Sequence, residues 1–302
     1  MTRPALPLAA ALAGGTLVLD GGLSNQLADQ GADLDDALWS ARLLADGPGE
    51  LTAAHAAYVR AGARVLITAS YQASFAGFAR RGTGLAESAA LFARSVHLAR
   101  QAAGQRPVWV AASVGPYGAV RADGSEYRGR YGLTTAELVR FHRPRVEALA
   151  AAAPDVLALE TVPDVTEAEA LLRAAEGTGL PVWLSYTVAG GRTRAGQPLA
   201  EAFAVAAGND QVIAAGVNCC APGDVEQAVR TAVRVTGKPG VAYPNSGEHW
   251  DAARRAWRGP GTYDVAAAIR WRAAGARLVG GCCRVGPSRI ARLSAALAGN
   301  DG

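Results

Sequence analysis

Two kinds of segment alternate along the chain. Short apolar runs rich in β-branched residues are followed by alanine-rich stretches in which apolar residues recur every three or four positions. The first kind is typical of strands buried on both faces, and the second of amphipathic helices. The pattern predicts strands at 16–20, 64–69, 107–113, 155–160, 181–187, 211–218, 239–243 and 276–281. It predicts helices near 50–61, 85–103, 134–152, 165–177, 198–207, 223–235, 262–274 and 287–298.

Eight strand-helix units of this kind predict an α/β fold, a (β/α)8 TIM-type barrel. Buried parallel strands joined by helical crossovers of one hand close most naturally into such a barrel. A doubly wound open sheet is the alternative, but the turn at Asp20-Gly21-Gly22-Leu23 lacks the GxGxxG pattern. The 302 residues are expected to form one barrel domain, 1–302, whose first residues, to about position 14, are a flexible or helical lead-in.

Charge and hydropathy restrict the partners to small molecules. The formal net charge is +4, but the basic residues are dispersed and Lys238 is the only lysine. Nucleic-acid binding, which needs a clustered basic face, is therefore not expected. No membrane association is expected either, because no apolar run approaches the roughly 20 residues of a span. Pro4 and Pro7 interrupt the apolar N-terminus, so we read no signal peptide there and expect a cytoplasmic protein, a monomer or homodimer.

The four cysteines form two adjacent pairs, Cys219-Cys220 and Cys282-Cys283. Adjacent cysteines rarely bridge each other, and a disulfide framework would spread its cysteines along the chain. Cys219 follows the sixth predicted strand, and the second pair follows the eighth. Because the carboxyl ends of barrel strands share one face, Cys219, Cys282 and Cys283 are predicted to meet there. Alternation along the strand turns Cys220 away, and its role stays open.

Three thiolates are soft ligands that suit zinc, and three protein ligands leave a fourth position for a substrate. Such a zinc ion is a poor activator of water, but it can hold a substrate thiol as thiolate near neutral pH. The resulting anionic centre favours a cationic electrophile, such as a sulfonium or ammonium methyl donor. The sequence has no GxSxG, HExxH or P-loop motif that would indicate other chemistry. The four histidines are expected to have ordinary surface roles on helices and in a loop.

These residues resemble the zinc-dependent homocysteine S-methyltransferases. The "GVNC" of 216–219 and "GGCCR" of 280–284 are similar to the zinc-binding motifs of that family, and the likeness covers nearly the whole chain. Further matches are "LDGGL" at 19–23, "LWSA" at 38–41, "SYQAS" at 70–74, "GPYGA" at 115–119, "DGSEYRGRY" at 123–131, "ALET" at 158–161 and "YPNSGE" at 243–248. One departure is Val285, where the family often has threonine after "GGCCR".

The resemblance implies a (β/α)8 barrel with zinc on Cys219, Cys282 and Cys283. It implies methylation of L-homocysteine to L-methionine. The donor motifs look most like the branch that uses S-methyl-L-methionine, with S-adenosyl-L-methionine as an alternative donor. Asp20 and Gly21 match positions that hold homocysteine.

The family pattern also assigns the remaining substrate residues. Glu160 matches a carboxylate that receives the amino group of homocysteine, and an ammonium inside a barrel mouth does need a paired anion. Asn218 is expected to orient the amino acid or the loop. Ser70 and Tyr71 are also expected in the substrate site. The long loop 115–133 is expected to cover the donor, with Tyr117, Tyr127 and Tyr131 offering ring faces to the sulfonium.

Other functions remain open on the same cysteines. The acceptor could be selenohomocysteine or selenocysteine, and the donor could be betaine. A cobalamin- and folate-using methionine synthase shares this type of module, but 302 residues leave no room for its additional domains. A non-enzymatic zinc or redox sensor would keep the cysteines without needing Asp20 and Glu160.

Overall fold

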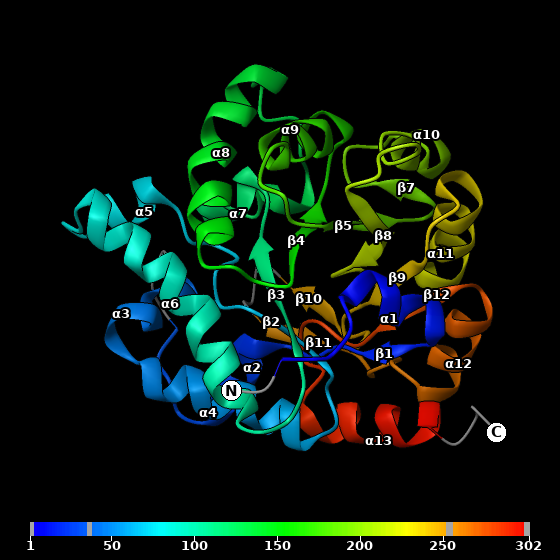
Figure 1. The fold of residues 1–302 in the computed structure, drawn as a ribbon. Coiled ribbons are helices and arrows are strands. Elements are labelled where there is room, and N and C mark those ends of the chain that lie inside the picture. Colours follow the sequence, from blue (N-terminus) through cyan, green and yellow to red (C-terminus); the bar gives the residue numbers. More distant parts are fainter. Residues whose placement is uncertain (1–2, 35–37, 252–255, 299–302) are drawn as a thin grey trace.

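The predicted barrel is confirmed. The computed structural model describes residues 3–34, 38–251 and 256–298 (Figure 1). Eight parallel strands form one sheet in the order β1-β12-β9-β8-β5-β4-β3-β2. A parallel bridge between Leu19 and Val65 joins the first strand to the second and closes the sheet. The strands are β1 (Leu17–Val18), β2 (Val65–Ile67), β3 (Trp109–Val114), β4 (Val156–Val162), β5 (Val182–Tyr186), β8 (Val212–Asn218), β9 (Gly240–Tyr243) and β12 (Ala276–Val279).

All eight predicted helices are present and surround the strands in Figure 1. A capping box of Thr134 and Glu137 begins the α8 helix, and Asp164 caps the α9 helix. These caps satisfy backbone N–H groups that have no partner within the helix. The helices are α4 (Pro48–Arg60), α6 (Leu85–Ala103), α8 (Thr135–Ala151), α9 (Val165–Ala175), α10 (Leu199–Ala204), α11 (Pro222–Thr236), α12 (Val265–Ala273) and α13 (Pro287–Ala298).

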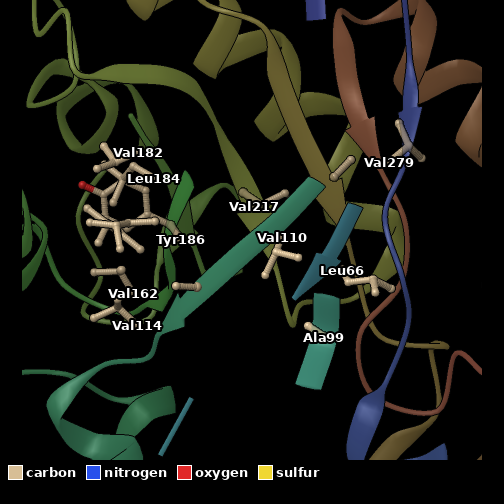
Figure 2. Close-up of a cluster of buried hydrophobic side chains, with 14 of the residues drawn as sticks. Leu66, Ala99, Val110, Val114, Val162, Val182, Leu184, Tyr186, Val217 and Val279 are labelled. Carbon is tan, nitrogen blue, oxygen red and sulfur yellow. The ribbon is translucent and has the colours of Figure 1, made fainter. Parts of the chain in front are cut away.

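The apolar core has two layers because both faces of every strand are covered. Alternate residues of β3 illustrate this: Trp109 and Ala111 belong to the cluster inside the barrel, whereas Val110 belongs to the cluster between strands and helices. Figure 2 shows side chains of this outer layer, among them Val110 and Leu184. Burial on both faces is the physical reason that these strands appear in the sequence as continuous apolar runs.

A short helix, α1 (Leu8–Gly14), precedes the first strand. Leu8 and Leu12 are buried in the cluster inside the barrel, together with Trp109 and Trp183. The indole Nε1 of Trp109 also donates a hydrogen bond to the carbonyl of Leu6 at 3.0 Å. The lead-in to the barrel is thus helical and packs on its interior. Among the described residues, no helix has the length and apolar character needed to traverse a bilayer.

Several short elements were not predicted from the sequence. Most occupy the connections that follow strands, where a few residues are too short to show a period. They are α2 (Leu23–Asp29), η1 (Trp39–Arg42), α3 (Leu43–Asp46), α5 (Phe75–Ala79), α7 (Tyr117–Arg121), η2 (Ser125–Tyr127) and two hairpins, β6 (Val188–Ala189) with β7 (Arg192–Thr193), and β10 (His249–Asp251) with β11 (Ala256–Arg258).

The expectation that the histidines have surface roles was wrong for two of them. His55 on α4 and His142 on α8 are fully buried, whereas His97 on α6 is exposed as expected. Burial lowers the pKa of His55 to about 4, so its imidazole is neutral at pH 7. A single histidine in an alanine-rich helix gives no sign of which face it occupies. His249 lies in the β10 strand, and its side chain is outside the described residues.

Candidate metal centre and substrate site

Three cysteine sulfurs meet at the carboxyl ends of the strands. Cys219 directly follows β8, and Cys282 and Cys283 follow β12. Their Sγ atoms all lie within 4.8 Å of one another, and Cys219 and Cys283 are 3.8 Å apart. All four cysteines of the chain are free thiols. Residues more than 60 positions apart in the sequence therefore form one cluster, as the barrel topology predicts.

The segment after β9 holds both cysteine turns. The carbonyl of Tyr243 accepts a hydrogen bond from the Cys219 N–H at 3.2 Å, and that of Pro244 accepts one from the Cys282 N–H at 2.7 Å. The Asn245 side chain accepts a third, from the Cys283 N–H at 3.2 Å. Cys219 itself has a φ of +52°, a strained backbone for a residue with a side chain. The "YPN" motif thus fixes the relative position of the two turns.

The glycines beside the cysteines permit close approach of two segments. A Cβ on Gly280 would lie 2.5 Å from Leu19, and one on Gly281 would lie 2.1 Å from the side chain of Val285. Val285 is fully buried, and its carbonyl accepts hydrogen bonds from the Gly22 N–H and the Tyr58 hydroxyl at 3.0 and 3.2 Å. The position that departs from the family pattern is therefore filled by an apolar side chain in the core.

The three sulfurs fit a zinc ion. With zinc-sulfur bonds of about 2.3 Å in tetrahedral geometry, neighbouring sulfurs lie about 3.8 Å apart, which is the separation of Cys219 and Cys283. The pKa of Cys282 is held well above its usual value by the contacts with Cys219 and Cys283 and by burial. Three thiols at this distance, one buried and two half-buried, cannot all ionise without a nearby cation, and a metal ion supplies that charge.

Cys220 lies apart from this cluster. Its side chain is 1% exposed and belongs to the apolar layer outside the barrel. Within the described residues, the group able to hold a metal contains the other three cysteines without Cys220. The strand alternation that turned Cys220 away in the sequence thus agrees with its place in the structure.

Two buried carboxyl groups lie near the carboxyl ends of barrel strands, Asp20 after β1 and Glu160 in β4. Asp20 is 1% exposed; its Oδ2 accepts a hydrogen bond from the Ile67 N–H at 2.8 Å. Its Oδ1 is enclosed and has no hydrogen-bond partner in the described part of the chain. Burial raises the pKa of Asp20 well above its usual value, and the charge of Glu160 raises it further. The free oxygen is suited to a donor group supplied by a ligand.

Glu160 on β4 is held by two hydroxyl groups. Ser113 donates a hydrogen bond to its Oε1, and Tyr243 donates one to its Oε2 at 2.9 Å. The Tyr243 hydroxyl oxygen also accepts a hydrogen bond from the indole N–H of Trp183 at 3.2 Å, and it lies 2.8 Å from the Ser185 hydroxyl. Burial raises the pKa of Glu160 to about 7, although both hydroxyl hydrogen bonds oppose the rise. The carboxylate is therefore rigidly placed and ready to pair with a cation.

Asn218 organises the backbone beside the metal ligands. Its Oδ1 accepts hydrogen bonds from the Thr161 N–H at 2.7 Å and the Ser185 hydroxyl at 2.8 Å, and its Nδ2 donates to the Thr161 hydroxyl at 2.7 Å. Thr161 has a φ of +56°, and these bonds stabilise that strained conformation. Asn218 thus links the end of β4 to the end of β8, directly before Cys219.

Tyr127, in the η2 turn, lies directly over the cysteines. Its hydroxyl is 3.1 Å from the Sγ of Cys219, while the residue as a whole remains 38% exposed. The guanidinium of Arg194 lies 5.6 Å from the centre of the Tyr127 ring. One face of this ring therefore already makes a cation-π contact with Arg194. The loop 115–133 thus reaches the cluster through the hydroxyl of Tyr127, and its expected position over the donor stays a prediction.

The other predicted substrate residues have different surroundings. The Ser70 hydroxyl donates to the Ser113 carbonyl at 2.8 Å and contacts the Thr68 hydroxyl at 2.7 Å. Burial raises the pKa of Tyr71 well above its usual value, and the charge of Cys219 raises it further. Gly21 approaches Val285 so closely that a Cβ would lie 2.0 Å from its carbonyl oxygen. Ser70 and Gly21 thus shape the backbone of the mouth.

Tyr117 points toward the outer helices. Its ring packs against Tyr131 and Phe141 with centroids 5.2 and 4.9 Å away, and its N–H donates to the Glu167 carboxylate at 2.5 Å. These contacts join Tyr117 to α8 and α9. The expected place of its ring beside the donor sulfonium stays a prediction.

A buried charge network supports the start of the covering loop. His142 Nε2 and Glu167 Oε1 are 3.0 Å apart, and both side chains are fully buried. Arg145, 1% exposed, donates to the Gly115 carbonyl, and the charge of Glu167 attracts its guanidinium. Burial lowers the pKa of His142, so its ring is neutral. The Nε2–H group of this ring donates a hydrogen bond to the Glu167 carboxylate. Glu167 thus balances Arg145 and anchors Tyr117.

Replacing Glu167 with glutamine is expected to lower the free energy of unfolding by about 2 kcal/mol, because the change leaves Arg145 buried without a counter-charge. Urea denaturation measures this loss. The matched control is Glu169→Gln on the same helix, where the side chain is partly exposed and a change below about 0.5 kcal/mol is expected. Equal stability of the two variants would show that the network does not stabilise the fold.

Four residues of the site were not singled out as site residues from the sequence. Ser113 and Tyr243 hold Glu160, Thr161 contacts Asn218, and Glu126 has an enclosed carboxylate oxygen next to Tyr127. Tyr243 and Thr161 could have been recognised as site residues from their positions near the carboxyl ends of strands. Ser113, near the carboxyl end of a buried apolar strand, could have been found as a polar residue out of pattern.

Comparison with known proteins identifies close relatives. Residues 17–297 match the family model described as homocysteine S-methyltransferase. The chain is 45% identical to homocysteine S-methyltransferase of Escherichia coli, over 92% of this chain and 94% of that protein. It is 44% identical to homocysteine S-methyltransferase 4 of Zea mays, over 94% and 90%. The solved metallated form of the homocysteine methyltransferase MmuM from Escherichia coli matches with a TM-score of 0.85 and 42% identity, over 96% of this chain and 99% of that chain.

Proposed function

The chain belongs to the homocysteine S-methyltransferase family, and from this we propose that it transfers a methyl group from S-methyl-L-methionine to L-homocysteine. The observation that carries the proposal is the cluster of three cysteine sulfurs within 4.8 Å, facing a mouth that also contains Asp20 and Glu160. We further propose that residues 1–302 act as one domain, in the cytoplasm, as a monomer or homodimer.

Cys219, Cys282 and Cys283 would hold the metal, and zinc is the ion that their number and softness favour. When bound, zinc supplies a Lewis acid that keeps the sulfur of homocysteine in its thiolate form near neutral pH. The residues of the chain fix the three sulfurs through the backbone hydrogen bonds of Tyr243, Pro244 and Asn245. Tyr127, whose hydroxyl touches Cys219, excludes water from one side of the cluster.

Glu160 and Asp20 would bind the amino group of homocysteine. The ammonium pairs with the Glu160 carboxylate, which Ser113 and Tyr243 hold in place. The unpartnered Oδ1 of Asp20 is free to accept a second hydrogen bond from the same ammonium. This two-point attachment would direct the thiol toward the cysteines and would distinguish an amino acid from a simple thiol.

Methyl transfer needs no acid or base from the chain. The bond between the donor sulfur and its methyl carbon breaks, and its electron pair stays on the donor sulfur, which becomes neutral. A bond between the methyl carbon and the homocysteine sulfur forms in the same step. The thiol proton has left on binding, so no proton moves during transfer. What the residues contribute is alignment of the two sulfurs and a site closed by the loop 115–133.

The binding of the amino group is expected to depend on pH. The pKa of Glu160 is raised to about 7 by burial, so its carboxylate is lost as the pH falls through this value. Methionine, which has the amino group of homocysteine but no thiol proton, isolates the effect. Its affinity is expected to fall by about tenfold per pH unit below pH 7. Calorimetric titration between about pH 5.5 and 8 measures the slope.

The Glu160→Gln variant is the control for this slope. It is expected to bind methionine weakly, with a flatter dependence on pH, because glutamine does not ionise. If the variant retains the full slope of the wild-type protein, another group is responsible and Glu160 does not receive the ammonium.

The donor is tested by parallel assays of methionine formation. Homocysteine is supplied with S-methylmethionine, S-adenosylmethionine or betaine, and selenohomocysteine is compared with homocysteine as acceptor. The fastest rate is expected for homocysteine with S-methylmethionine. A higher rate with betaine or S-adenosylmethionine would reassign the donor, and the absence of turnover with every pair would contradict methyl transfer itself.

A further inference from the structure

The side chain of Glu126 is unexplained by the contacts described so far. It lies in the η2 turn, immediately before Tyr127. Its Oε2 atom is enclosed and has no hydrogen-bond partner among the described residues. A carboxylate removed from water without a partner costs free energy, so such a group either stores strain or serves a ligand.

The turn that carries Glu126 lies against the reaction centre. The next residue, Tyr127, places its hydroxyl 3.1 Å from the Sγ of Cys219. Beneath the turn, a Cβ on Gly118 would lie 2.4 Å from the backbone nitrogen of Glu126, so the turn rests directly on the α7 helix. Burial raises the pKa of Tyr71, and the charges of Cys219 and Glu126 both raise it further. The enclosed Oε2 of Glu126 therefore belongs to a turn whose next side chain reaches the cysteine cluster.

Two arginines of the surrounding loops have other partners. Arg121 pairs with Asp123 at 2.9 Å, and the guanidinium of Arg194 lies 5.6 Å from the centre of the Tyr127 ring. Burial, and then the charge of Cys219, raise the pKa of Glu126 to about 7. A cationic ligand beside Glu126 would offset the cost of burying its charge and would favour the ionised form.

We propose that Glu126 selects the positively charged methyl donor, with its carboxylate facing the sulfonium centre. This inference rests on the proposed methyl transfer and adds a specificity residue to it. The positive charge exists in the donor and disappears as the methyl group leaves. The attraction is therefore stronger for the bound donor than for the transition state or the neutral product. Glu126 lowers the KM for the donor without raising kcat, and it releases the product once the charge is gone.

The test compares Glu126→Gln with the wild-type protein, because glutamine keeps the shape and removes the charge. The KM for S-methylmethionine is expected to rise about tenfold or more, while kcat changes by less than about threefold. The metal content and the affinity for homocysteine are expected to stay unchanged. Asp123→Asn is the matched control: it removes a charge from the same loop, at an exposed position, and its Oδ1 can still accept from the Ser125 N–H.

A direct binding measurement separates the sulfonium from the rest of the donor. Calorimetry with S-methylmethionine and with methionine, whose sulfur has one methyl group fewer and is neutral, is run on the wild-type protein and Glu126→Gln. The variant is expected to lose about tenfold or more in affinity for S-methylmethionine and less than about threefold for methionine. Glu126→Asp, which keeps the charge on a shorter side chain, is expected to lie between the two proteins.

Two results would overturn the inference: an unchanged donor affinity in Glu126→Gln, or an equal loss for S-methylmethionine and methionine. Failure of the proposed function would look different, since the wild-type protein would then form no methionine from any donor. Metal content and circular dichroism of each variant show whether it has folded, and Glu126→Asp provides the comparison if glutamine disturbs the turn.

Discussion

Replacing Cys282 with serine is expected to weaken metal binding by at least about 100-fold and to lower the rate of methionine formation by on the order of 10³-fold. The binding free energy of zinc at a structural site with four protein ligands is about 10–16 kcal/mol, so each ligand contributes about 3 kcal/mol. Serine is a poor replacement because its hydroxyl is a much weaker acid than a thiol. Metal analysis of the purified variant, with competition by a chelator, measures the first effect, and steady-state assays measure the second.

Cys220→Ser is the matched control, because it makes the same atomic change at the neighbour of Cys219. Cys220 lies in the apolar layer outside the barrel, so this variant is expected to lose some stability and to keep its metal. Cys282→Ser with a full complement of metal and wild-type turnover would show that the cysteine cluster is not the site of the reaction.

Replacing Glu160 with glutamine is expected to raise the KM for homocysteine by at least about 100-fold, which corresponds to about 3 kcal/mol. The amide oxygen of the variant can still accept one of the two hydrogen bonds from Ser113 and Tyr243, but the ammonium of the substrate then enters a buried site without its counter-charge. Steady-state kinetics at saturating donor measure the change, and the metal content is expected to remain at the wild-type value.

Tyr243→Phe provides the comparison for Glu160. It removes the hydroxyl that donates to Glu160 Oε2 at 2.9 Å and leaves the carboxylate in place. Its effect on the KM for homocysteine is expected to be about tenfold or less. If Glu160→Gln raises the KM for the donor and leaves the KM for homocysteine unchanged, Glu160 binds the donor and not homocysteine.

The barrel could be predicted from the sequence because each strand is covered on both faces. In β3, Trp109 belongs to the apolar cluster inside the barrel and Val110 to the cluster between strands and helices. Because both faces are buried, the strand is an uninterrupted apolar run in the sequence. The elements that were missed, such as the η2 turn of Ser125–Tyr127, are a few residues long and show no period. Their shape depends on contacts such as that between Gly118 and the backbone of Glu126, which no local pattern records.

The candidate site was predictable to the extent that topology determines it. Cys219, Cys282 and Cys283 converge because strand ends share one face of a barrel. The direction in which a loop side chain points was not available from the sequence. Tyr117 packs on Phe141, whereas Tyr127 reaches Cys219. The buried partner of Glu167, His142, also went unrecognised, because a pairing between two helices depends on their packing.

The central claim is that the three cysteines hold a metal at which homocysteine is methylated. The most direct measurement is methionine formation from homocysteine and S-methylmethionine by the purified protein, before removal of its metal, after removal, and after return of zinc. The account predicts about one metal ion per chain. It predicts two methionine molecules for each homocysteine consumed, since the demethylated donor is also methionine, with loss of activity on removal and recovery with zinc. Equal methionine formation by the metal-free and metal-loaded protein would contradict it.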